Sequence, residues 1–410
     1  MRNLSISKTT AEGLLRAACV LVLCGILVAG LWPFHAPKNA VSWLSNRNGL
    51  LFGDYGSILS AGEFRPSASK DGPCSLEIWL QPAATVDSND IVAFSTEKNP
   101  VQFAVAQSGD DLFVTRNVVD PQQHVRKSHL AIDHVFRAGD KLLITITSGP
   151  RGTVVYLNGT MAKTSPKFTF GSKDFAGELV IGNSPVQNNT WGGQLWGLEI
   201  VDRDLTAAEI LQHYDSWSKN FGAQLAGTDG TRALYVFNEG EGRVVHNQIA
   251  SEPDLRIPEH YFVLHKKFLE PFWKEFRPNW VFAKDVILNV VAFVPLGFLL
   301  CAYFSSVRAL NRPRLVAIIL GGAVSLTIEI LQAYLPTRES GTLDIITNTT
   351  GTAAGAILCG SHFVQVLLVK TGLHTSQPSI SKLNLEVEPQ LYRANAAGRQ
   401  EEPMKSRHSA

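Results

Sequence analysis

Apolar and polar positions divide the chain into a polar middle and very apolar flanks. Residues 14–32 are apolar apart from Arg16, and three further apolar runs lie near 286–305, 315–335 and 345–369. A helix needs about 20 apolar residues to cross a bilayer. The pattern therefore predicts a multi-pass membrane protein, with a transmembrane anchor over 14–34 and an α-helical bundle of three spans over 282–370.

The N-terminal run has two interpretations. It is either an uncleaved anchor after a short polar N-terminus over 1–13, or a signal peptide that is removed. We favour the anchor, because no cleavage site of the small-x-small type follows the run.

Residues 45–250 follow a different pattern, in which short alternating runs are separated by Gly, Pro, Asn and Asp. Leu76, Ile78 and Leu80 share one face of a strand over 75–82. Several such strands with turn signals between them are typical of an all-β sandwich. The stretch 231–250 is expected to add a strand to this sandwich or to lie against the membrane-proximal segment.

Two local signals sharpen the prediction for the β region. Asn158-Gly159 follows a strand and is a strong signal for a hairpin turn. Thr206 and Glu209 have the spacing of a capping box, in which each side chain bonds the other residue's backbone N–H. A short helix is therefore predicted to begin after Thr206.

Residues 257–281 mix aromatic residues with lysines. This mixture suits a membrane surface, where aromatic rings lie at the depth of the headgroups. A soluble amphipathic helix is the alternative. We expect an interfacial linker helix, because a spanning segment follows directly.

Each of the three C-terminal runs carries a pair of polar residues among its apolar positions. The pairs are Asp285 with Asn289, Glu329 with Gln332, and Asp344 with Asn348. Spacings of three and four residues place both members of a pair on one face of a helix. Ionisable residues within a membrane span are costly, so they mark candidate functional sites.

The three pairs lie near one membrane face if the second span runs outward and the other two run inward. Asn289, Glu329 and Asn348 are then roughly 6–10 Å inside their helix ends, at about 1.5 Å of rise per residue. Arg338 lies in the short loop between the second and third of these spans. The expected result is a polar pocket that opens to one side of the bilayer.

Basic residues set the expected orientation, because they gather on the cytoplasmic side. Arg308, Arg312 and Arg314 follow the first span of the bundle, and Lys370 follows the last. One consistent topology places both termini in the cytoplasm, with the β region and the 336–343 loop outside. The polar tail over 373–410 is expected to be cytoplasmic and disordered.

The polar pairs also carry a resemblance. Asn-x3-Phe-x-Pro-x-Gly from Asn289, Glu-x2-Gln-x3-Pro-x-Arg from Glu329 and Asp-x3-Asn-x2-Gly-x3-Gly from Asp344 resemble the VanZ-like membrane protein family. The resemblance covers about 282–370. It implies a bacterial cell-envelope protein and a link to resistance against the glycopeptide antibiotic teicoplanin. Many members have an acid three residues after the arginine, where this chain has Gly341.

The β region resembles the concanavalin A-like, laminin-G-like jelly roll. The resemblance rests on the strand over 75–82, the hairpin at Asn158-Gly159 and the closing stretch 204–210. Such domains often bind glycans, sometimes with calcium, although a plain scaffold is the favoured interpretation here.

Residues for glycan or calcium binding are few in the β region. Gly109-Asp110-Asp111 is the nearest candidate for a calcium loop, and a plain turn is the favoured interpretation. Trp191 and Trp196 are candidates to stack on sugar rings, but at least one is expected in the core.

Composition excludes some function classes. Charged residues are 18% of the 410 and the net charge is +1, so no overall basic character argues for nucleic acid. No cysteine or histidine spacing indicates zinc, and no metal or other cofactor is expected. Only Cys74 of the five cysteines falls in the β region, which therefore cannot form an internal disulfide.

Two functions fit these patterns. In the first, the pocket binds or acts on the headgroup of a membrane lipid or an envelope glycan. Arg338 pairs with a phosphate or carboxylate, and Glu329 and Asp344 are the candidate catalytic acid and base. Ligand-binding roles are expected for Asp285, Asn289, Gln332, Arg338 and Asn348. The competing interpretation is that these polar groups only hold the helices together.

In the second, the protein is a non-catalytic membrane anchor whose jelly roll binds a cell-wall or surface glycan. Transport is a weaker third interpretation, because four spans are few and no repeat of the bundle appears. The sequence leaves open whether the protein is an enzyme and which oligomeric state it adopts.

Overall fold

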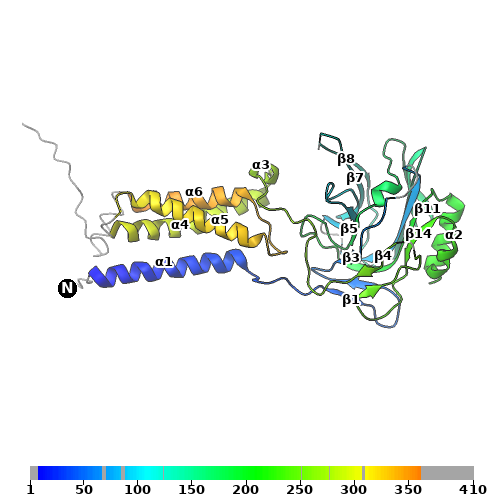
Figure 1. Cartoon of the computed structure of the whole chain (residues 1–410), viewed down its shortest axis with the longest axis horizontal. Helices are drawn as coiled ribbons and strands as arrows, with labels where there is room; N and C mark the ends of the chain where they lie inside the picture. Colours follow the sequence, from blue (N-terminus) through cyan, green and yellow to red (C-terminus); the bar gives the residue numbers. More distant parts are fainter. Residues whose placement is uncertain are drawn as a thin grey trace, which may run out of the picture.

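The computed structural model describes residues 8–66, 71–84, 88–122, 124–250, 252–276, 278–306 and 310–361. The molecule is elongated, with a helix bundle at one end and a β domain at the other (Figure 1). The tail expected over 373–410, and residues 1–7 of the expected N-terminal segment, lie outside the described residues.

Two antiparallel sheets form the β domain, as the alternating pattern predicts. The first has the strand order β1-β2-β13-β4-β9-β10-β11, and β14 also pairs with β13. The second has the order β15-β16-β3-β12-β5-β6-β7-β8. The strands of the first sheet are β1 (Val41–Trp43), β2 (Leu50–Phe52), β4 (Cys74–Pro82), β9 (Leu142–Gly149), β10 (Gly152–Leu157), β11 (Thr160–Ser165), β13 (Gly193–Val201) and β14 (Thr231–Tyr235). Those of the second are β3 (Ile58–Ser60), β5 (Ser88–Ser95), β6 (Phe103–Ser108), β7 (Asp111–Val119), β8 (Val125–Ile132), β12 (Glu178–Ile181), β15 (Val244–Val245) and β16 (Leu255–Arg256).

Three local predictions for this domain are confirmed. Asn158 and Gly159 make the turn between β10 and β11, and both have positive φ angles. Thr206 caps α2 (Ala207–Ser218) and forms both bonds of the capping box with Glu209. The stretch 231–250 adds β14 to the first sheet and β15 to the second.

The core lies between the two sheets, and a second apolar layer covers the outside of the first sheet. Leu76, Ile78 and Leu80 face the common core, as predicted. The opposite face of β4 is also buried, because α2 and the 3-10 turn η2 (Gly222–Gly227) pack there against Trp79 and its neighbours. A further 3-10 turn, η1, spans Ser172–Phe175.

Trp191 and Trp196 are both buried, at 1% and 8% exposure. Trp191 donates a hydrogen bond to Gln107 within the core. The expected core role is therefore confirmed for both tryptophans, and neither offers a free face to a sugar ring.

The bundle contains α1 (Lys8–Leu31), α4 (Trp280–Ser306), α5 (Pro313–Gln332) and α6 (Thr342–Cys359). Glycines bring α4 and α6 unusually close. A Cβ at Gly351 would lie 2.1 Å from the Val290 carbonyl oxygen, and one at Gly355 would lie 2.0 Å from that of Val294. Backbone contact of this kind is typical of helices that associate through small residues.

Three of the described helices are long and apolar enough to cross a membrane. They are Glu12–Leu31 within α1, then α4, then α5. The first half of α6 holds Asp344, Asn348 and several threonines, which lower its mean hydropathy. The four-span topology therefore stays a prediction.

The single linker helix expected over 257–281 is wrong. Among the described residues of this segment, only α3 (Phe272–Glu275) and the start of α4 are helical. Pro258, Pro271 and Pro278 interrupt it, and proline both removes a backbone donor and disfavours helix in the residue before it. The composition indicates an amphipathic surface, but the prolines forbid a continuous helix.

The segments that lead into and out of the β domain pair with each other. Lys38 and His260 form an antiparallel bridge. Asn39 N–H donates to the Glu259 carbonyl at 3.1 Å, and Tyr261 N–H donates to the Pro37 carbonyl at 3.0 Å. The β domain is thus an insertion between α1 and α4 whose two ends adjoin (Figure 1).

Candidate functional site

The predicted polar pairs gather at the end of the bundle that faces the β domain. This end is built from the N-termini of α4 and α6 and the C-terminus of α5. Side-chain hydrogen bonds join the three helices there, so the structure brings these carboxylates and amides together, while their common depth in a membrane stays a prediction.

Asn289 of α4 and Asp344 of α6 form the first contact. Asn289 Nδ2 donates to Asp344 Oδ1 at 2.8 Å, and both side chains are partly exposed. Asp285 lies one turn nearer the start of α4, is exposed and adds negative charge near Asp344. The bond leaves the second carboxylate oxygen of Asp344 available.

Glu329 of α5 is the most deeply buried acid of the bundle, at 1% exposure. Its Oε2 accepts a 2.8 Å hydrogen bond from the backbone N–H of Gly341, at the N-terminus of α6. Ser340 Oγ donates to the Glu329 carbonyl at 2.8 Å. The free N–H groups and dipole of a helix N-terminus favour a carboxylate at this position.

Gln332 and Asn348 point toward other helices. Gln332 Nε2 donates to the Gly30 carbonyl of α1 at 2.7 Å, and Asn348 Nδ2 donates to Ser325 Oγ of α5 at 2.9 Å. Both contacts fit interhelical bonding. The Oε1 of Gln332 and the Oδ1 of Asn348 are buried without a hydrogen-bond partner among the described residues.

Glu275 of α3 joins the site, and the sequence pattern did not reveal it. Its carboxylate lies where a side chain at Gly341 would project, because a Cβ there would be 2.4 Å from Glu275 Oε1. Burial raises the pKa of Glu275, and the charge of Asp344 adds to the effect. The chain therefore supplies a third carboxylate next to Glu329 and Asp344.

Arg338 and Lys266 bring positive charge to the same region. Both line a small pocket between the 336–340 loop, the linker and the 186–188 loop of the β domain. The Arg338 guanidinium is half-buried and makes no hydrogen bond or ion pair with another residue that the structure describes. Lys266 Nζ donates to the carbonyls of Gln332 and Leu335 at the end of α5.

Burial lowers the pKa of Lys266 to about 8, and the nearby charge of Arg338 also lowers it. Lys266 could not be found from the sequence, because its partners lie more than sixty residues away along the chain. The only available signal was the group of basic and aromatic residues over 257–281.

The β domain has a separate groove of about 1000 Å³ on the side of the second sheet. Its lining is mainly polar and charged, and Arg116 crosses it to bond Asp174 at 2.9 Å. Other lining residues include Asn99, Gln102, Asn117 and Lys173.

Comparisons with known proteins follow the two halves of the fold. Residues 236–365 match the model of the VanZ/LLP1 family. Residues 55–211 match the model of the concanavalin A-like lectin/glucanases superfamily. The comparison with curated protein sequences gave no match.

Similar solved structures match at low identity. A proposed carbohydrate-binding protein from Bacteroides ovatus is 13% identical, with a TM-score of 0.36, over 54% of this chain and 58% of that one. A heptameric SAP-like pentraxin from Limulus polyphemus is 14% identical, with a TM-score of 0.32, over 54% of this chain and 94% of that one. The botulinum neurotoxin serotype D binding domain is 14% identical, with a TM-score of 0.30, over 44% and 45%. The chain therefore joins a VanZ-like segment and a concanavalin A-like jelly-roll domain in a single polypeptide.

Proposed function

We propose that the protein binds the polar headgroup of a membrane lipid or lipid-linked envelope molecule at the end of the bundle beneath the β domain. The observation that carries the proposal is the Arg338 guanidinium, which is half-buried in a pocket and unpaired among the described residues. Guanidinium groups bind phosphates and carboxylates through two parallel hydrogen bonds, so an unpaired arginine in a pocket favours an anionic ligand.

The other polar residues at this end of the bundle have different proposed roles in binding and catalysis. Lys266 adds a second cation beside Arg338, and these two groups hold the anionic part of the headgroup. Glu329 accepts from the backbone at the N-terminus of α6, Asp344 lies in the first turn of that helix, and the two are the acid and base if the site is catalytic. Asn289 holds Asp344 in place.

Orientation in the membrane is part of the proposal. Arg312 and Arg314 lie at the far end of the bundle from the β domain, and Arg314 donates to the Gly360 carbonyl there. Basic residues favour the cytoplasmic side. Exposed Trp273 and Trp280 lie at the end near the β domain, as expected for aromatic rings at a membrane surface. The pocket then faces the extracytoplasmic side, with the β domain outside.

Native mass spectrometry of protein released gently from membranes tests the binding role. We expect a discrete lipid-sized ligand on the parent chain and its loss from Arg338→Ala. Glu339→Ala is the matched control, because this exposed neighbour also carries charge and lines the pocket. A parent chain without a specific ligand, or an Arg338→Ala variant that keeps it, would contradict the proposal.

Catalysis is tested separately with Glu329→Gln, which keeps an oxygen to accept from Gly341 but cannot exchange a proton. If the site is catalytic, this variant retains the co-purifying ligand and loses turnover. A variant that keeps full turnover excludes Glu329 as the acid or base. The link to teicoplanin is tested by comparing the drug's inhibitory concentration in strains that express parent or Arg338→Ala protein.

The groove on the β domain favours a second function, glycan binding by the jelly roll. The exposed charged side chains of Glu97, Lys98 and Lys173 on its lining are suited to sugar hydroxyls, whereas the neighbouring amides already donate to backbone carbonyls. Glycan-array binding by the full chain in detergent, lost on Arg116→Ala but retained by Arg338→Ala, would support this role. Binding to no envelope glycan would count against it.

A further inference from the structure

Two glutamates face each other inside the first sheet. Leu76-Glu77-Ile78 of β4 pairs in antiparallel register with Leu198-Glu199-Ile200 of β13, so Glu77 lies directly opposite Glu199. Both side chains are 0% exposed. Like charges directly opposite on neighbouring strands destabilise a sheet, and burial without full compensation adds to the cost. A positive charge or a shared proton is therefore needed at this point.

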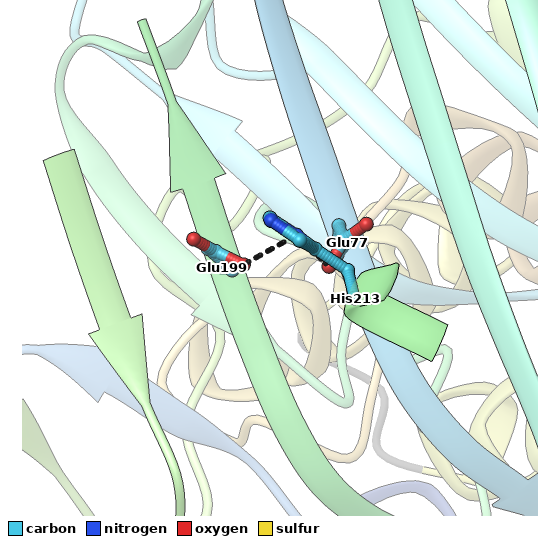
Figure 2. A group of neighbouring side chains, drawn as sticks. All are labelled: Glu77, Glu199 and His213. Carbon is cyan, nitrogen blue, oxygen red and sulfur yellow. Dashed lines mark hydrogen bonds and ion pairs between the residues drawn. The ribbon is translucent and has the colours of Figure 1, made fainter. Parts of the chain in front are cut away.

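Helix α2 places His213 against this pair (Figure 2). His213 Nδ1 lies 3.2 Å from Glu77 Oε2 and 3.4 Å from Glu199 Oε2. One atom from each of the three residues lies within 4.8 Å of the other two. His213 is also buried, so the group is closed to solvent.

Hydroxyl groups orient the two carboxylates from behind. Thr145 Oγ1 donates to Glu77 Oε1 at 2.9 Å, and Thr231 Oγ1 donates to Glu199 Oε1 at 3.0 Å. The remaining oxygen of each carboxylate is thereby directed toward His213. Hydrogen bonds of this kind around the ligands are typical of metal sites, where they fix the ligand atoms.

Hydrogen bonds alone do not satisfy every polar atom of Glu77, Glu199 and His213. The Nδ1 atom carries one proton at most, so it cannot donate to both Glu77 Oε2 and Glu199 Oε2, and Glu77 Oε2 already accepts from Trp217 Nε1 at 2.9 Å. Glu199 Oε2 is buried and has no hydrogen-bond partner among the described residues. A protonated His213 would cancel only one of the two carboxylate charges.

We propose that Glu77, Glu199 and His213 form a buried binding site for one divalent transition-metal ion, with zinc the best match. Two carboxylates and a neutral imidazole balance the charge of such an ion. Imidazole nitrogen and carboxylate oxygen are zinc ligands, whereas calcium and magnesium prefer oxygen alone. Ligands at about 2.0–2.1 Å in a tetrahedral site lie about 3.4 Å apart, close to the observed separations.

The site would be structural, with a buried water as the fourth ligand that a tetrahedral zinc ion needs. It joins α2 to β4 and β13, and its full burial leaves no path for a substrate. The three residues come from distant parts of the chain, so no residue spacing in the sequence predicts this metal site.

Elemental analysis of the full chain tests the proposal. The protein is purified in detergent without an affinity tag of histidines, and without added metal or chelator. We expect about one zinc ion per chain, and a fall below about a tenth of that in His213→Gln and Glu199→Gln. His134→Gln is the matched control. His134 forms an exposed cluster with Asp110 and Asp111, and unchanged zinc content in this variant shows that the cluster does not bind the metal.

A second measurement tests the proposal on the parent protein, in case the variants fail to fold. Parent protein is stripped with a chelator and refilled with cobalt(II), whose visible absorption reports tetrahedral coordination. The melting temperature should fall on stripping and recover on refilling with zinc or cobalt. A folded parent with no bound metal, and with a melting temperature that chelator and zinc leave unchanged, overturns the proposal and assigns the group to a hydrogen-bonded clamp.

Discussion

The amide of Asn289 on α4 donates a 2.8 Å hydrogen bond to the carboxylate of Asp344 on α6. The two residues are fifty-five positions apart, and within the residues that the structure describes they make the only side-chain hydrogen bond between these two helices near the β domain. Asn289→Leu removes the amide donor, so the Asp344 carboxylate loses this hydrogen bond. We expect a loss of about 1–3 kcal/mol in stability, as for an unsatisfied polar group.

Thermal melting in detergent measures this loss, and Asp285→Leu is the control, since Asp285 is exposed and bonds no described neighbour. The double variant with Asp344→Leu should recover part of the stability, because both polar partners are then gone. Equal losses in all three variants would show that the bond itself contributes nothing.

The glycine contacts between α4 and α6 predict a steric effect. Gly355→Ala forces a methyl group to within 2.0 Å of the Val294 carbonyl oxygen, so the helices must separate. A destabilisation of about 1–3 kcal/mol is expected from overpacking. Gly25→Ala on α1 has open space around its Cβ and should change the melting temperature little. Equal effects of the two substitutions would argue against close packing as the role of Gly355.

Gly341→Ala should act on the linker and leave the bundle intact. The new methyl group meets the end of a flexible side chain, the Glu275 carboxylate, and displaces it from α6. Faster hydrogen exchange over residues 270–276 is the expected readout. Glu275→Ala should give the same increase, and combining the two changes should add nothing further. Unchanged exchange in both single variants would mean that Glu275 does not hold the linker in place.

The lowered pKa of Lys266 predicts the direction in which the stability of the fold changes with pH. Its pKa is about 8 in the folded chain, below the ordinary 10.5, because burial disfavours the charged form. Between these values the unfolded chain binds more protons, so this group favours the folded state increasingly as pH rises from about 8 to 10.5. The melting temperature of the parent, relative to Lys266→Met, should rise across that window. A constant difference would show that Lys266 titrates as an ordinary lysine.

Local rules predicted much of the β domain. The alternation of Leu76, Ile78 and Leu80, the turn at Asn158 and the cap at Thr206 each depend on residues close in sequence. The same holds for the polar pairs of the bundle, because helix periodicity alone places each pair on one face.

Contacts that depend on tertiary packing could not be predicted from the sequence. Glu275 reaches the site because its segment docks on α6, and prolines prevent the single helix that composition suggests. His213 meets Glu77 from 136 residues away. Glu77 occupies the strand face that alternation assigns to solvent, and α2 covers that face in the fold.

The bridge between Lys38 and His260 joins the segments that enter and leave the β domain. The N–H of His265 in the linker also donates to the Pro185 carbonyl of the β domain at 2.7 Å. Anything that the groove captures would stay within reach of the Arg338 pocket, at an effective concentration of about a millimolar. If both proposed sites bind, they would act as one stronger site for any ligand long enough to reach both, and no conformational signal would have to pass between them.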